Sequence, residues 1–237
     1  MGIPRAKPHA PRPSASVMLR RGEEILVCHR VSGVPSFPDY WAFPGGGVSR
    51  SDREALDAHP EWFTERGDDE RAALVALMRE MIEEVGITPG ENGLQLIEPE
   101  LREQILEDKT AWKRLVESSE ISIEDSGFVV ISERTTPPLA PLRFRNHFFT
   151  VECNVEPVLH VGDRPEFDKF RWATPDQLLD EWMSNEIRLP PPLVMILREL
   201  LEDTMEKSVV RMSTAPPRKN VRIEFGPGVE CLPLPTD

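Results

Sequence analysis

The residues with the clearest chemical potential lie between positions 79 and 84, where Arg79 is followed by Glu80, Glu83 and Glu84. On a helix with about 100° per residue, Glu84 lies about 40° to one side of Glu80, and Glu83 lies about 60° to the other. Like charges at this spacing repel by roughly 0.2–0.5 kcal/mol per pair on an exposed helix. The acids are therefore either a solvated surface or the lining of a cation site.

Both interpretations have a physical basis. A surface helix normally carries polar groups opposite its apolar face, and Leu74, Met78 and Ile82 lie on the far side of this helix. A hard divalent cation such as Mg²⁺ selects several oxygen ligands, which three carboxylates within one turn can supply. In the second case, Arg79 would hold one carboxylate through a forked hydrogen bond.

A glycine turn upstream favours the cation site. Residues 40–43 read as a short strand, and Gly45–Gly47 follow it directly. Glycines let the main chain approach a ligand closely and expose its N–H and C=O groups. The acids themselves belong to the clearest helix in the sequence, which begins near Asp68–Asp69 and ends at Val85 before the stop signal Gly86.

The other predicted helices and strands must hold the glycine turn and the acidic helix in position. The pattern predicts a β-hairpin from residues 14–20 and 24–30, and further strands at 127–136, 143–153 and 167–174. Helices are expected weakly at 51–66, as one or two pieces at 99–118, at 174–183 with a Thr174 cap, and as one closing helix at 189–207. This mixed order predicts an α/β sandwich rather than a regular parallel array.

Composition restricts the partners. The 237 residues carry a formal net charge of -13, which argues against a nucleic-acid polymer or an anionic membrane as partner. Cys28, Cys153 and Cys231 are few and widely spaced, so a reducing cytoplasm is expected. The basic, proline-rich start lacks an apolar core of the secretory type, and no apolar run reaches the roughly 20 residues of a membrane span.

The pattern from the glycine turn to the helix end resembles the Nudix box, and the chain is similar to Nudix hydrolases. The second half of the box reads Arg-Glu, apolar, any residue, Glu-Glu, any residue, Gly, apolar. The matching residues in this chain are Arg79, Glu80, Met81, Glu83, Glu84, Gly86 and Ile87. The resemblance implies an α/β/α sandwich with a mixed sheet, here with an enlarged box loop and extra helices.

Two departures from the box concern its first half. The first glycine usually lies about 14 residues before the arginine, whereas Gly45–Gly47 lie 32–34 residues before Arg79. An insertion is therefore expected at about 49–69. The box also has a glutamate eight residues before the arginine, where this chain has Arg71. Either Glu70 or Asp69 takes over that structural role, or the role is absent.

The resemblance also implies a domain layout. We expect a flexible arm at 1–13, the Nudix domain at 14–206 with insertions at about 49–69 and 99–118, and an extension at 207–237. The extension reads as two short β segments around Gly226-Pro227-Gly228 and is similar to the opening strands of a metallo-β-lactamase-type domain. It is either the start of a further domain or a simple extension.

Within the family, the chain resembles the branch of the peroxisomal coenzyme A diphosphatases and their bacterial relatives. The resemblance rests on residues 41–52, 143–151 and 186–200. It implies hydrolysis of a diphosphate in a nucleotide conjugate, with coenzyme A or an acyl-CoA giving adenosine 3′,5′-bisphosphate and a phosphopantetheine. The branch signatures are only partly matched, since Ser49 replaces an acid and Arg145-Asn146 replaces Asp-Thr, although Asp52 is retained.

The resemblance assigns roles to particular residues. Glu80, Glu83 and Glu84 would bind Mg²⁺ or Mn²⁺, together with a main-chain carbonyl near Gly46, while Arg79 orients them. The cation would neutralise the diphosphate and lower the pKa of the attacking water. Besides Glu83, Glu166 before the strand at 167–174 is the expected external base, with Glu133 as a weaker candidate. Glu166 as an ordinary loop acid is the alternative.

Substrate contacts are expected from Arg30, Phe43, Arg145 and His147. Arg30 ends a strand near the glycine turn, and its alternative is a solvated strand end. Of Phe43 and Trp41, one should face inward and the other could stack on a base. Arg145 and His147 share one strand face, and His147 is alternatively a structural histidine.

Other functions remain open at this level. The same chemistry could act on ADP-ribose, NADH or a diadenosine polyphosphate, or the fold could sense a nucleotide without cleaving it. The chain could also be an interaction protein whose acids are only solvated. If the protein is an enzyme of either kind, its partner is a small nucleotide conjugate. A homodimer is one option for its assembly.

Overall fold

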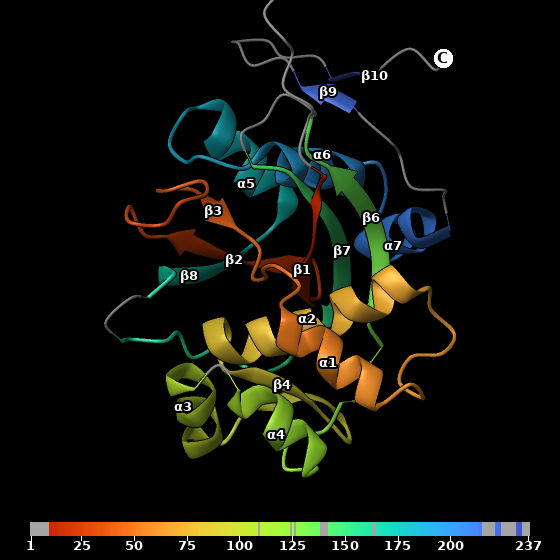
Figure 1. Ribbon diagram of the computed structural model, residues 1–237. Coiled ribbons are helices and arrows are strands. Elements are labelled where there is room, and N and C mark those ends of the chain that lie inside the picture. Colours follow the sequence, from red (N-terminus) through yellow and green to blue (C-terminus); the bar gives the residue numbers. More distant parts are fainter. Residues whose placement is uncertain are drawn as a thin grey trace, which may run out of the picture.

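The computed structural model describes residues 10–108, 110–123, 125, 127–137, 142–162 and 165–214, and the backbone of two short strands at 221–223 and 231–233. Helices and strands alternate along this part of the chain and gather into three layers (Figure 1).

A six-stranded mixed sheet forms the middle layer. Its order is β3-β2-β1-β7-β6, and β8 pairs with β2. The strands are β1 (Arg12–Arg21), β2 (Glu24–Arg30), β3 (Trp41–Ala42), β6 (Val129–Thr135), β7 (Phe144–Glu152) and β8 (Phe167–Ala173). Of these pairings, β1 with β7 is parallel and the others are antiparallel. The expected hairpin at 14–20 and 24–30 is confirmed.

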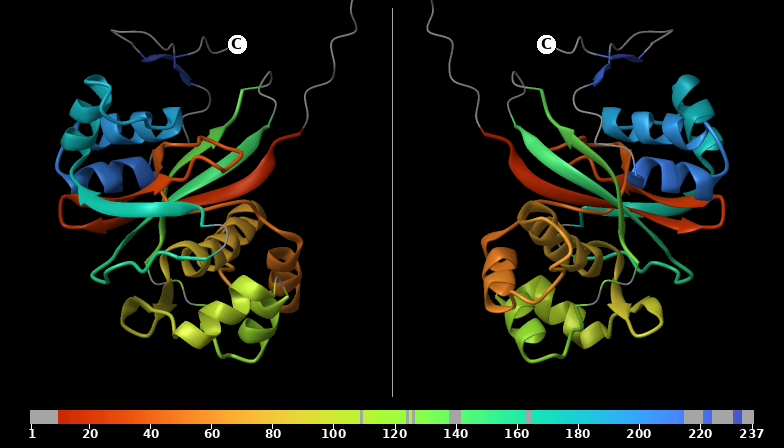
Figure 2. Two further views of the ribbon diagram at one scale, coloured as in Figure 1. Left: turned by 90° about the vertical axis from the view of Figure 1, so that its left-hand side faces the viewer. Right: turned by 90° about the vertical axis from the view of Figure 1, so that its right-hand side faces the viewer.

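Helices cover both faces of the sheet (Figure 2). One face carries α2 (Asp68–Val85), with α1 (Arg50–Ala58), α3 (Pro99–Glu107) and α4 (Ala111–Glu117) beyond it; the other carries α5 (Pro175–Met183), α6 (Pro191–Leu200) and α7 (Met205–Thr214). Alternating side chains of β1 explain the arrangement, because Val17 and Leu19 join the core cluster under α2 and Met18 joins the cluster under α6. The predicted α/β/α sandwich is confirmed.

Several boundaries differ from expectation. The first strand begins at Arg12, so the last two residues of the expected arm are part of the sheet, while residues 1–9 lie outside the described residues. A short hairpin, β4 (Ile87–Gly90) with β5 (Gly93–Leu96), follows α2 and was not expected. The insertion at 99–118 contains two helices.

The expected single closing helix is wrong. It divides into α6, which ends at Leu200, and α7, which begins at Met205. In the turn between them, the Thr204 N–H donates a hydrogen bond to Asp203 Oδ1 (2.8 Å). Val209 and Met212 of α7 then join the core cluster under α6. The helix α7 continues to Thr214, past the expected domain end at 206.

Two short strands follow, β9 (Val221–Ile223) and β10 (Cys231–Pro233), which pair antiparallel as the sequence predicts. The Gly226-Pro227-Gly228 segment between them lies outside the described residues. Among the described helices, none combines the length and the apolar character that crossing a bilayer requires.

Candidate active site

The last turns of α2 carry the acidic cluster. The helix ends where the sequence predicts, at Gly86, whose φ of 68° is the left-handed conformation of a helix C-cap. The apolar face of the helix, with Leu74, Met78 and Ile82, is completely buried against the sheet. The helix is thereby fixed in rotation, and its glutamates face a gap between α2 and β8.

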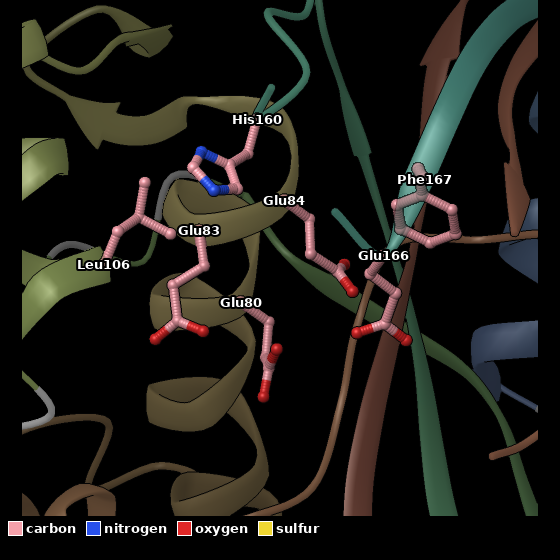
Figure 3. A pocket seen from close by; sticks show the side chains of 7 residues that line it. All are labelled: Glu80, Glu83, Glu84, Leu106, His160, Glu166 and Phe167. Carbon is pink, nitrogen blue, oxygen red and sulfur yellow. The ribbon is translucent and has the colours of Figure 1, made fainter. Parts of the chain in front are cut away.

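Four carboxylates line one cavity in this gap (Figure 3). The cavity has a volume of about 120 Å³, and its lining consists of Glu80, Glu83, Glu84, Leu106, His160, Glu166 and Phe167. Glu166 lies across from the helix at the start of β8, and the Glu84 carboxylate is turned toward it. Residues 80 and 166, far apart in the sequence, thus meet as the sequence predicts.

Arg79 is the centre of the ion-pair network beside the cavity. Its Nε and Nη2 atoms donate to the two carboxylate oxygens of Asp52 at 2.9 and 3.0 Å. Its Nη1 donates to Glu83 at 3.0 Å, and its Nη2 lies 2.9 Å from Glu80. A further hydrogen bond reaches the Gly47 carbonyl (3.1 Å). One buried guanidinium therefore orients two glutamates and ties the helix to the glycine turn.

Asp52 was not predicted to be part of the site. It is completely buried, and Ser49 fixes it by donating hydrogen bonds from its N–H (2.8 Å) and its hydroxyl (2.7 Å). Because Asp52 holds Arg79 through two hydrogen bonds, it is in a position to supply the structural role expected of a glutamate at position 71. Most of the insertion expected at about 49–69 lies between Asp52 and the start of α2.

Neither expected substitute for that glutamate takes part. Asp69 pairs with Arg145 and Glu70 pairs with Arg66, both near the start of α2. Arg71 itself donates to the main-chain carbonyls of Trp62 (2.8 Å) and Pro60 (2.6 Å), and so anchors the inserted loop. The expectation that Glu70 or Asp69 replaces the missing glutamate is wrong, because each neutralises a different arginine.

The glycine corner touches two of the glutamates directly. The Gly45 N–H donates to Glu84 Oε2 at 2.7 Å. A Cβ atom on Gly46 would lie only 2.3 Å from Glu80 Oε1, so any side chain there would displace the carboxylate. The Gly46 carbonyl accepts a hydrogen bond from the Ala15 N–H (2.9 Å). The predicted role of the Gly46 carbonyl as a metal ligand depends on the second lone pair of its oxygen.

Burial makes the glutamates hard to ionise without a cation. Burial raises the pKa of Glu84 well above its usual range, and the charges of Glu166 and Glu80 add to the shift. Burial also raises the pKa of Glu80 to about 7, although Arg79 opposes this. The pKa of Glu83 is raised by burial in the same way. Burial disfavours the charge of Arg79, but Asp52 and the glutamates outweigh it and raise the pKa of Arg79.

The donor set fits a hard divalent cation. Glu84 Oε1 is buried and has no hydrogen-bond partner, although a buried carboxylate oxygen normally has one. The ligand type is right for Mg²⁺ or Mn²⁺, which select carboxylate oxygens. Among the described residues, no three acidic side chains are already placed so that together they could hold a metal ion. Arg79 holds Glu80 and Glu83, and a bound cation would have to draw them toward Glu84.

Arg30 also reaches the cavity edge. Its Nη2 lies 2.6 Å from Glu166 Oε1, and its Nε donates to the Ser36 carbonyl at 2.9 Å. The alternative of a solvated strand end is thereby excluded for Arg30, because its side chain is largely buried by these contacts. Its predicted contact with phosphate stays a prediction.

Phe43 is wrongly predicted as a substrate contact. Only 6 % of it is exposed, and it belongs to the core cluster under α6, on the face of the sheet opposite the cavity. Trp41 shares that face and lies beneath the Arg171 guanidinium (4.7 Å) and next to His29. The alternation of β3 thus turns both rings away from the carboxylates.

Arg145 and His147 do not reach this cavity. They lie near the start of α2, which is about 16 Å along the helix from Glu80. Arg145 pairs there with Asp69, and the buried His147 lies 3.5 Å from Glu133. Burial lowers the pKa of His147, as expected for the structural alternative that the sequence left open. Glu133, the weaker candidate for the base, lies with His147 and therefore away from the cavity.

Two further residues near the glutamates were missed, one in the insertion at 99–118 and one between β7 and β8. Arg102 of α3 is buried and donates to the Glu83 carbonyl at 3.0 Å, where it supports the end of α2. His160, in the segment between β7 and β8, lines the cavity beside Glu83 and Glu84. No spacing signal in the sequence connects either residue with the glutamates.

Acids at a helix end, a glycine corner and a mixed sheet between helices together define a hydrolase of the diphosphatase class. The sequence profile of the NUDIX domain matches residues 10–191. The chain belongs to the Nudix family, as its box and its fold predict, and it is a Nudix diphosphatase. None of the curated proteins compared with it matches.

The chain is also similar to several solved structures. The NUDIX hydrolase from Alicyclobacillus acidocaldarius superimposes with a TM-score of 0.72 at 24 % identity, over 87 % of this chain and 99 % of that one. The MutT NUDIX hydrolase from Burkholderia pseudomallei has a TM-score of 0.43 at 17 % identity, over 83 % of this chain and 99 % of its own. The NUDIX domain of Shewanella oneidensis NrtR, complexed with ADP ribose, has a TM-score of 0.45 at 10 % identity, over 82 % and 88 %.

Proposed function

We propose that this Nudix hydrolase cleaves the diphosphate of a nucleoside diphosphate conjugate, with coenzyme A or an acyl-CoA as the substrate. One observation carries the proposal: Glu80, Glu83, Glu84 and Glu166 line a single cavity in which Glu84 Oε1 is buried without a partner. Water attacks one phosphorus, and the other phosphate leaves with its substituent.

The cation site would be formed by Glu80, Glu83 and Glu84, with the Gly46 carbonyl as a further ligand. When bound there, Mg²⁺ or Mn²⁺ supplies charge neutralisation for the diphosphate and a lower pKa for the attacking water. Arg79 keeps Glu80 and Glu83 in their rotamers through its contacts of 2.9 and 3.0 Å. These roles are supported by the raised pKa values of Glu80 and Glu83, because a cation offsets the cost of burying their charges and the repulsion from neighbouring carboxylates.

Glu166 is our candidate for the general base. Its carboxylate is partly exposed at the cavity, so it can accept a proton from the attacking water and release it to solvent. The ion pair with Arg30 keeps that carboxylate in place in the substrate-free protein. On binding, the guanidinium of Arg30 is near enough to share its charge with a substrate phosphate.

The size of the cavity supports a substrate that extends beyond it. A volume of about 120 Å³ is well below the roughly 300–1,000 Å³ of sites that enclose a whole small molecule. The diphosphate and its cations would occupy the cavity, and the groups on either side of the diphosphate would lie outside. Coenzyme A has this form, with a nucleotide on one side and a long pantetheine arm on the other.

A substrate panel with Mg²⁺ tests the proposal, using coenzyme A, ADP-ribose, NADH and a diadenosine polyphosphate. We expect phosphopantetheine and adenosine 3′,5′-bisphosphate from coenzyme A, and their loss in Glu83→Gln. Glu91→Gln, an exposed acid in the turn between β4 and β5, is the matched control and should keep full activity.

The outcomes separate the alternatives. If ADP-ribose or NADH is turned over and coenzyme A is not, the substrate is one of these alternative conjugates. Binding without turnover of any compound would favour a nucleotide sensor. The homodimer, the cytoplasmic location and the domain boundaries predicted from the sequence remain proposals as well.

A further inference from the structure

The loop between β2 and β3, residues 31–40, carries two aromatic rings that the core does not use. Phe37 and Tyr40 contact each other with ring centroids 5.3 Å apart and planes tilted by 60°. Among the described aromatic residues, only Phe37, Tyr40 and Phe144 join neither core cluster. Phe37 is 43 % exposed. Burial of apolar surface therefore does not explain this pair.

The backbone of the loop is strained where it presents the ring. Phe37 has a φ of 49° and Asp39 a φ of 61°, both in the left-handed region. A bulky residue such as phenylalanine is rarely found there, because its Cβ crowds the carbonyl oxygen. Strain of this kind is often found at ligand-binding sites, although Phe63, Ser119 and Asn185 also have positive φ values elsewhere in the described chain. The exposed Phe37 ring is thus held on a strained backbone.

A single side chain connects this loop to the carboxylate cavity. The Arg30 guanidinium donates from Nε to the Ser36 carbonyl at 2.9 Å, and its Nη2 lies 2.6 Å from Glu166. Ser36 immediately precedes Phe37. Only the width of one guanidinium group therefore separates the main chain beside Phe37 from a carboxylate of the cavity.

The alternation of the strands places Tyr40 on the cavity side of the sheet. Cys28 belongs to the core cluster under α2, so Arg30, two residues further along β2, faces the same side. The Arg30 N–H donates to the Tyr40 carbonyl at 2.8 Å, in continuation of the pairing of Cys28 with Ala42. Directly opposed residues of paired strands share a face. Tyr40 and Arg30 thus lie on the face that carries the glutamates.

We propose that Phe37 and Tyr40 form a stacking surface for the nucleobase of the substrate. The inference rests on the proposed function and deepens it, since a cavity of about 120 Å³ leaves the base outside. Aromatic side chains stack on any base, because every base has a π-face. The surface therefore selects a heteroaromatic ring joined to a diphosphate, and Arg30 sets the separation between the two.

Binding measurements test the surface without relying on turnover. We compare ADP, which has a base, with inorganic diphosphate, which has none, by titration calorimetry in the presence of Mg²⁺. Phe37→Leu and Tyr40→Leu should each weaken ADP binding by about 5-fold or more. Both variants should leave the binding of diphosphate unchanged, and Phe37→Trp should retain or improve ADP binding. Phe144→Leu removes a ring outside both clusters elsewhere and is the matched control.

A kinetic measurement complements the titrations. With coenzyme A, the two leucine variants should raise KM by about 5-fold or more and leave kcat unchanged. Unchanged ADP affinity in both variants would overturn the stacking surface, and so would equal losses for ADP and diphosphate. Failure of the wild-type protein to turn over coenzyme A would overturn the proposed function instead, while the ADP titrations would still report on the ring contact.

Discussion

The two ends of α2 are both acidic, yet they differ in how the acids are balanced. At the start of the helix, Asp69 and Glu70 pair with two different arginines, Arg145 and Arg66. At its end, the acids outnumber the guanidinium groups that contact them. Within the part of the chain that the structure describes, the ion pairs of this acidic group involve only two arginines, Arg79 and Arg30, whereas the group has five carboxylates: Asp52, Glu80, Glu83, Glu84 and Glu166.

The helix dipole sharpens this difference. Acids near a helix N-terminus are stabilised by the partial positive charge there, whereas acids near the C-terminus are destabilised. Burial adds to the cost at the end of α2, as the raised pKa values of Glu80 and Glu84 show. The start of α2 is thus stable as it is, whereas its end has an unmet demand for positive charge. Burial and charge balance, rather than the number of acids, distinguish a site from a surface.

The largest expected effect comes from removing one charge at each end. Glu84→Gln should reduce kcat by about 10²–10⁴-fold with Mg²⁺, because a metal ligand is lost. At a pH above the raised pKa of Glu84, the same variant should unfold at a higher temperature than the metal-free wild type, since a buried charge is removed. Glu70→Gln at the start of the helix should leave kcat within about 2-fold. Equal losses of activity in the two variants would contradict the comparison.

A second expected effect concerns pH. The pKa of Glu80 is about 7 in the folded protein, against about 4.3 in an unfolded chain. Between these values the folded state keeps a proton that the unfolded chain has lost, so the free energy of unfolding falls as pH rises from 4.3 to 7. The full difference is about 4 kcal/mol at most.

Thermal unfolding with EDTA checks this expectation. The metal-free protein should have a lower Tm at pH 8 than at pH 5.5, and Glu80→Gln should reduce the difference. With saturating Mg²⁺ the trend should reverse, because the cation binds the deprotonated carboxylates. A metal-free Tm that is higher at pH 8 would show that other groups control the stability.

The smallest expected effect separates Asp52 from Asp69. Asp52→Asn weakens the pair of hydrogen bonds that holds Arg79. It should reduce kcat/KM by about 10–100-fold, the range found when a residue that orients metal ligands is changed. Asp69→Asn at the start of α2 removes an exposed pair and should change activity little. Asp52→Glu should recover part of the loss, which a purely destabilised fold would not show. Steady-state kinetics with coenzyme A give these values.

Much of the fold could be predicted because its signals are local. A few neighbouring residues are enough to recognise the apolar periodicity of α2 and its end at Gly86. The same holds for the start of α5, where the Thr174 cap is followed by Pro175. The break between α6 and α7 was missed because the apolar pattern continues through it. The β4–β5 hairpin is short, and its pairing depends on the end of α2 rather than on a strong pattern of its own.

The site was predictable only where the motif is continuous. Glu80, Glu83 and Glu84 follow from their spacing, and Glu166 from its place before β8. Asp52 was missed because the insertion separates it from Arg79 by 27 positions. The side of the sheet to which Phe43 points depends on which face α2 covers, and this is a tertiary property.

The placement of the insertion after Asp52 has a consequence for engineering. Asp52 is fixed by Arg79 at one end of the inserted segment, and Arg71 holds the carbonyls of Pro60 and Trp62 at the other. Lengthening a loop between fixed points costs little, about 0.6 kcal/mol for each doubling. Thr64 and Glu65, which are exposed within this segment, are therefore a suitable place for grafting a fluorescent reporter or for opening new chain termini by circular permutation.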